Sequence, residues 1–98
     1  MNPAIDFPWD KLNVTGTGTV HTGPCVLHTV TFNGMTTVGD CALYDGVSAA
    51  GVLVATYNCR TAVSISYQGM TFLYDCEMVT GIHMVFTGLV GNFTVTFK

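Results

Sequence analysis

The side chains of this chain that could carry out chemistry are three histidines, six carboxylates and four cysteines. None of them stands in a G-x-S-x-G, H-E-x-x-H or phosphate-loop pattern. His28 lies in phase with the apolar residues of its strand, where a buried, hydrogen-bonded histidine is expected, and nothing indicates that it converges with the other two histidines, His21 and His83. Four carboxylates flank glycines or strand ends, a position typical of turn capping: Asp40, Asp45, Asp75 and Glu77. We therefore expect no metal site, no cofactor and no enzymatic activity.

The four cysteines are evenly spaced and contain no C-x-x-C pair, which argues against zinc-finger and thioredoxin-like sites. They are Cys25, Cys41, Cys59 and Cys76. Two interpretations stay open: four free thiols acting as small buried hydrophobes, or two disulfides, for which we predict the pairs Cys25–Cys41 and Cys59–Cys76. The first residues have neither the basic nor the apolar region of a signal peptide, which favours the free thiols.

The elements that must position these groups are β-strands. Only 9% of the residues are charged, and the chain is rich in Thr, Val and Gly. Apolar and polar residues alternate in short segments separated by turn signals such as Gly23-Pro24, Asn33-Gly34 and Asp45-Gly46. The predicted strands span 14–20, 25–32, 41–45, 52–57, 62–67, 70–74, 79–86 and 92–97. Segment 52–57 (VLVATY) is almost continuously apolar, which is typical of a strand covered on both faces.

This pattern predicts an all-β fold: a single antiparallel β-sandwich over residues 14–98, jelly-roll-like, with seven or eight short strands. Residues 1–13 differ, because Pro3 and Pro8 oppose helix and central strand. We predict an extended N-terminal arm there. Its apolar cluster, Phe7, Pro8 and Trp9, either folds back onto the end of the core or docks on a partner, since Trp is an enriched interface anchor.

The charge balance restricts the partners. The net charge is −3, and the basic residues Lys11, Arg60 and Lys98 are scattered, so neither nucleic acid nor an anionic membrane is expected to bind. Small soluble domains usually carry more charge than this. The deficit is explained either by association with other subunits or by a neutral, Thr-rich surface.

Two stretches carry a resemblance to small virion proteins of tailed bacteriophages. They are residues 25–46 (CVLHTVTFNGMTTVGDCALYDG) and 48–57 (SAAGVLVATY), followed by Thr80-Gly81-Ile82 and a closing TVT strand. The resemblance implies a structural protein of the particle, most closely a head decoration (cement) protein that binds the outer surface of the major capsid protein. It also implies a homotrimer, a virion location after assembly in the host cytoplasm, and no catalytic residues.

A second interpretation is a carbohydrate- or receptor-binding module of a phage fibre or spike. Such a module needs exposed aromatic rings, for which the tyrosines are the candidates. They are Tyr44, Tyr57, Tyr67 and Tyr74, and most of them are in phase with apolar neighbours. We therefore expect these rings to lie in the core or at its margin.

Overall fold

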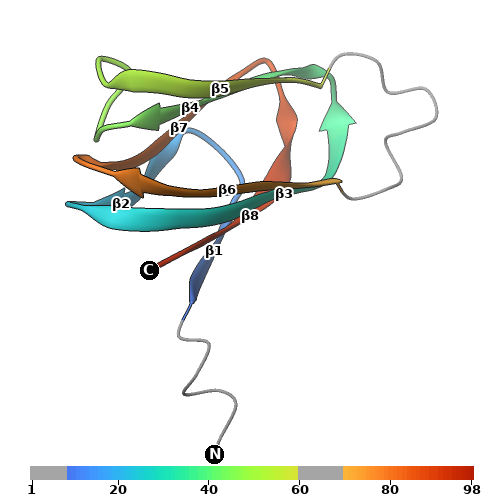
Figure 1. The fold of residues 1–98 in the computed structure, drawn as a ribbon. Coiled ribbons are helices and arrows are strands. Elements are labelled where there is room, and N and C mark those ends of the chain that lie inside the picture. The colour runs from blue at the N-terminus through green and yellow to red at the C-terminus, as the bar shows by residue number, and fades with distance from the viewer. Residues whose placement is uncertain (1–8, 60–69) are drawn as a thin grey trace, which may run out of the picture.

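The chain folds into two layers of antiparallel strands (Figure 1). The structure is a computed structural model that describes residues 9–59 and 70–98. The first sheet contains, in spatial order, β1 (Asp10–Val14), β8 (Val90–Phe97), β3 (Cys25–Thr37) and β6 (Met70–Met78). The second sheet contains β2 (Gly18–Thr22), β7 (Gly81–Thr87), β4 (Gly39–Asp45) and β5 (Val52–Cys59). The described residues thus confirm an all-β chain with eight strands, compatible with a β-sandwich, and none of them is helical.

The hydrophobic core lies between the two sheets and follows the alternation of the strands. In β8, Phe93, Val95 and Phe97 are buried, whereas Thr94 and Thr96 point away from the core, as the sequence predicts. The fully buried side chains come from both layers: Leu27, Val30, Cys41, Leu43, Met78, Ile82, Met84, Phe93 and Val95. Each large apolar side chain buried in this way stabilises the fold by about 1.5–3 kcal/mol.

Aromatic contacts centre on Phe93, in the middle of the core. The ring centroids of Phe32, Tyr57 and Phe86 lie 5.2, 5.4 and 5.7 Å from that of Phe93. Phe32 belongs to the first sheet, whereas Tyr57 and Phe86 belong to the second. Because tilted and edge-to-face ring pairs add stability beyond the area they bury, this cluster helps to hold the two layers together.

Asn33-Gly34 is not a turn, contrary to the sequence prediction. β3 continues to Thr37, because Gly34 and Met35 go on pairing with Asn92 and Gly91 of β8. The Asn33 side chain donates to Asn92 Oδ1 at 2.9 Å. A cross-strand amide contact therefore replaces the local turn that this dipeptide otherwise favours.

The N-terminal boundary also differs from the prediction. Residues 10–13, assigned to an arm, belong to β1, which pairs antiparallel with β8 from Asp10↔Phe97 to Val14↔Phe93. Residues 14–20, expected to form one edge strand, contain the end of β1 and the start of β2. The Gly-rich segment between the two strands takes the chain from the first sheet to the second. Residues 1–8, including Phe7 and Pro8, and the predicted strand 62–67 lie outside the described residues.

Gly39 is required where β4 approaches the turn before β8. A Cβ atom at this position would lie 2.1 Å from the backbone nitrogen of Leu89, closer than any real Cβ contact. Leu89 is buried, so this close approach seals the adjacent end of the core. Among the residues that are described, no helix is available to span a membrane.

Candidate functional site

The centre of the outer face of the first sheet is polar, and its side chains hydrogen-bond one another across the strands, while Val26 and Leu73 are exposed beside it. The hydroxyl oxygens of Thr29 and Thr96 are 2.6 Å apart, and those of Thr31 and Thr71 are 2.9 Å apart. Asn33 donates to Thr94 at 2.9 Å as well as to Asn92. Cross-strand pairs of this kind stabilise a sheet by about 0.2–1 kcal/mol each. These uncharged contacts therefore help to order the centre of this face.

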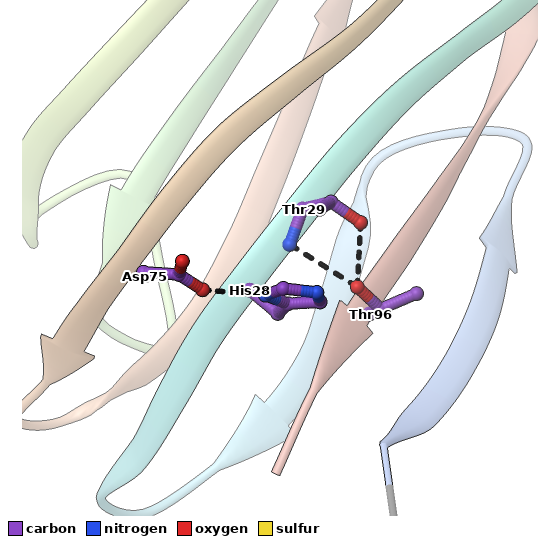
Figure 2. Close-up of polar contacts among 4 residues, drawn as sticks. All are labelled: His28, Thr29, Asp75 and Thr96. Carbon is purple, nitrogen blue, oxygen red and sulfur yellow. Dashed lines mark hydrogen bonds and ion pairs between the residues drawn. The ribbon is translucent and has the colours of Figure 1, made fainter. Parts of the chain in front are cut away.

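A β-bulge places His28 on this outer face, beside Asp75 of β6. The register between β3 and β6 shifts between Leu27 and Thr29, and Asp75 has a φ of 47°, which is uncommon for a residue other than glycine. The Asp75 carboxylate lies 2.5 Å from His28 Nδ1. Figure 2 shows the two side chains, from neighbouring strands, directed toward each other. The expectation of a core histidine was wrong, because the extra residue changes which side chains of β3 point inward.

Trp9 covers the His28 ring. The two rings are stacked, with centroids 4.1 Å apart and planes inclined by 7°. Trp9 therefore lies on the outer face of the first sheet rather than over the end of the core. Trp9, His28 and Asp75 form a cluster in which an aromatic ring, an imidazole and a carboxylate are held together. We call it the Trp9 cluster.

The outer face of the second sheet is different in character. Its central positions carry no charge and several apolar groups, and Asp40 is at one end of β4. Cross-strand partners here are Tyr44 with Leu53 and His83, and Ala42 with Val85 and Thr56. Their neighbours Cys41 and Leu43 are buried, so alternation directs this set outward. We call these six residues the second-sheet face: Ala42, Tyr44, Leu53, Thr56, His83 and Val85.

Asp45 fixes the corner next to the second-sheet face. Its carboxylate accepts hydrogen bonds from the backbone N–H groups of Thr80 and Val79, both at 2.9 Å, and of Gly81 at 3.4 Å. These bonds lower the pKa of the Asp45 carboxyl, with burial opposing them. Asp45 therefore caps a turn, but the turn is the distant one between β6 and β7 and not the local one beside Gly46 that the sequence predicts.

Exposed aliphatic side chains surround that corner. Val52 and Val79 are 70% and 66% exposed, and Val47 is also exposed. Gly81 leaves no room for a side chain, since a Cβ there would lie 2.5 Å from the carbonyl oxygen of His21. The backbone that presents these valines is therefore tightly constrained.

The four cysteines are not bonded to one another in the described part of the chain. Burial raises the pKa of Cys41 to about 12, and burial is also the main cause of the raised pKa of each of the others. Cys25 and Cys41 lie in different sheets, as do Cys59 and Cys76. By register, Cys25 is diagonal to Cys76, and Cys41 to Cys59. The disulfide pairs predicted from the sequence stay predictions.

The tyrosines do not form an exposed platform in the part of the chain that is described. Tyr57 is buried, and its hydroxyl oxygen is 2.6 Å from that of Tyr74, which joins β5 to β6 across the two sheets. Burial and this hydrogen bond raise the pKa of Tyr57. Tyr44 belongs to the second-sheet face, and Tyr67 lies outside the described residues.

Residues 9–59 and 70–98 contain no group of three His, Cys, Asp or Glu side chains that could hold a metal ion. Sequence reasoning missed the Asp75–His28 contact, because a bulge leaves no period-2 signal. It also missed the second-sheet face, for which a signal existed: Cys41 to Tyr44 (CALY) is apolar at successive positions, as is segment 52–57. Comparison with known proteins finds no matching family model, curated protein or solved structure.

Proposed function

We propose that this chain is a structural protein of a bacteriophage particle, most specifically a decoration protein that binds the outside of the capsid and forms a homotrimer. The observation that carries the proposal is the nested pairing of the strands. β1 pairs with β8, β2 with β7, β3 with β6, and β4 with β5. Nested pairs distributed over two sheets support a jelly roll, an architecture used in viral capsid domains and in lectins.

The proposed mechanism is mechanical. A decoration protein stabilises a shell by burying area across the junctions between capsid subunits, and a stable contact buries upward of about 1,200 Å² in total. The low charge of the chain suits such a contact, because few ionic groups have to lose their water. The resemblance to phage virion proteins supports the same role.

The N-terminal segment is the proposed capsid contact. Trp9 is held against the outer face of the first sheet by its stacking on His28. Phe7 and Pro8 would supply apolar contacts beside Trp9, and an aromatic anchor flanked by apolar residues is a common centre of binding energy. In this arrangement the first sheet is directed toward the shell.

Co-sedimentation with capsids of the phage that encodes the chain tests this function. The full chain is compared with a version lacking residues 1–8, which leaves β1 intact. In a third version residues 1–8 are replaced by eight Gly and Ser residues. This version distinguishes the effect of the length of the segment from the effect of its side chains. We expect the full chain alone to sediment with the capsids. Equal sedimentation of all three would contradict the role of the segment, and no sedimentation of any would contradict the function.

A glycan-binding module of a fibre or spike is the second candidate, and the Trp9 cluster favours it. An aromatic ring next to a carboxylate and an imidazole offers both an apolar surface and hydrogen-bonding groups for a sugar. Glycan-array binding by the full chain that disappears in Trp9→Ala would favour this candidate over decoration. Absence of binding by the full chain would reject it.

A further inference from the structure

We propose that the second-sheet face is the contact between copies of this chain, so that a second copy covers Tyr44, Leu53 and Val85. This inference rests on the homotrimer of the proposed function and adds the surface through which the copies meet. Four features of the described residues lead to it: the apolar pattern of β5, the distribution of charge, the position of β5 at the edge of its sheet and the area of the face.

The first feature is a conflict between the sequence of β5 and its surroundings. Residues 52–57 have the nearly continuous apolar character of a strand covered on both faces. Within the described residues only the inner face is covered, by contacts such as that of Tyr57 with Phe93. Leu53, on the outer face, is 54% exposed. A partner that covers the outer face removes this conflict.

The second feature is the distribution of charge. The first sheet carries Lys11, Asp75 and Glu77 on or beside its outer face, and the polar ladder there is already satisfied. The six residues of the second-sheet face carry no charge, and the nearest carboxylates, Asp40 and Asp45, lie toward the two ends of β4. Copies of a chain with a net charge of −3 repel one another, and they can approach most closely where neither presents an unpaired charge. A closed trimer joins two different patches of neighbouring copies, so the second-sheet face of one copy meets the exposed valines around Asp45 of the next, and neither surface needs an opposite charge in its partner.

The third feature is the edge of β5. In the described part of the chain β5 has β4 as its only strand neighbour, and the eight residues of β5 include no charge and no proline. Natural proteins usually protect a long edge strand with charged residues, proline or a covering segment. The other long edge, β6, carries Asp75 and Glu77. Of the two long edges in the described residues, that of β5 is thus the one without charge or proline, and only a bulge at Val54 interrupts its register with β4.

The fourth feature is area. The six residues of the second-sheet face lie on three strands. Three strands about 4.8 Å apart, with seven residues rising about 3.4 Å each, make a face of about 340 Å². A stable interface needs about 600–1,000 Å² from each partner. The valines around Asp45 continue the apolar surface from Leu53 to Val52, Val47 and Val79. The second-sheet face alone is therefore too small, and a stable contact between copies has to include this corner.

The test compares two leucines that occupy equivalent places in the two sheets. Leu53 lies on the outer face of edge strand β5 and Leu73 on that of edge strand β6, with exposures of 54% and 66%. Leu53→Glu and Leu73→Glu are made in the full chain, and circular dichroism and urea unfolding confirm that both remain folded. Sedimentation equilibrium then measures self-association. A second variant, Val85→Thr, changes the face conservatively at the central strand β7.

We expect Leu53→Glu to weaken self-association at least 30-fold, because it removes a buried leucine and introduces a charge, and Leu73→Glu to leave it within about threefold of wild type. Val85→Thr should weaken it by a smaller factor. Equal association of Leu53→Glu and wild type would overturn this assignment while leaving the trimer in place. A wild-type chain that stays monomeric at every concentration would overturn both the assignment and the trimer, whereas capsid co-sedimentation tests the decoration role separately.

Discussion

Asp45 offers the sharpest test of how the corner of the fold is held together. Its carboxylate accepts three backbone hydrogen bonds, from Val79 through Oδ2 and from Thr80 and Gly81 through Oδ1. A hydrogen bond contributes about 0.5–1.5 kcal/mol to the free energy of unfolding. Hydrogen bonds to a solvent-exposed carboxylate stay near that range, because water screens the charge. We expect Asp45→Ala to lower the free energy of unfolding by about 2 kcal/mol. Asp45→Asn keeps one acceptor oxygen and should lose about half as much.

The pH dependence follows from the lowered pKa of Asp45. A carboxyl whose pKa is lower in the folded state stabilises the fold fully above its unfolded pKa, and this stabilisation is lost as the pH falls through the folded value. The stability gap between wild type and Asp45→Asn should therefore be constant near neutral pH and narrow below the ordinary value of 3.8.

Urea unfolding at one fixed protein concentration measures these differences, because self-association also affects apparent stability. With a denaturant dependence of about 1.3 kcal/mol per M, Asp45→Ala should shift the midpoint by about 1.5 M. Glu77→Gln, which removes an exposed carboxylate from β6, is the control for the change in net charge and should shift it little. If the difference in the free energy of unfolding between wild type and Asp45→Asn were as large below pH 3.8 as at pH 7, the reasoning would be refuted.

Two further predictions concern the packing of the fold and the Trp9 cluster. Gly39→Ala should lower the free energy of unfolding by more than about 3 kcal/mol, because the added Cβ would overlap the Leu89 backbone. Gly18→Ala is the control, and it should be neutral or slightly stabilising because nothing lies within 4 Å of the added Cβ. Similar effects at both positions, in thermal or urea unfolding, would contradict this packing. Trp9 is the only tryptophan, so the fluorescence of the chain reports on this residue. His28→Ala should shift the emission of Trp9 to longer wavelength, because the indole ring loses its stacking partner. An unchanged emission spectrum would mean that the stack does not form in solution.

The sequence predicts the strands of this fold better than their partners. Alternation correctly identifies the inward residues of β8, such as Phe93 and Val95, because a half-buried strand imposes a period of two. The same period says nothing about which strands pair, so the nested pairing and the two sheets become visible only in the structure. The Asn33-Gly34 prediction fails because a contact with β8, distant in sequence, outweighs the local turn preference.

The candidate surfaces, too, could be predicted from the sequence only in part. The Trp9 cluster depends on a bulge at His28 and on the left-handed backbone of Asp75, and neither leaves a pattern in the residues. The second-sheet face was partly foreseeable. The apolar run of β5 predicts cover on both of its faces, and the structure identifies Leu53 as the outward residue that a single copy leaves exposed. Burial within one chain and burial between chains produce the same pattern in a sequence.

The measurement that tests the central claim most directly is the solution mass of the full chain by light scattering on a sizing column, over a wide range of concentration. Our account of a self-associating virion protein predicts a species of about three times the 10.5 kDa chain that persists on dilution. A single species with the mass of one chain at every concentration would contradict it.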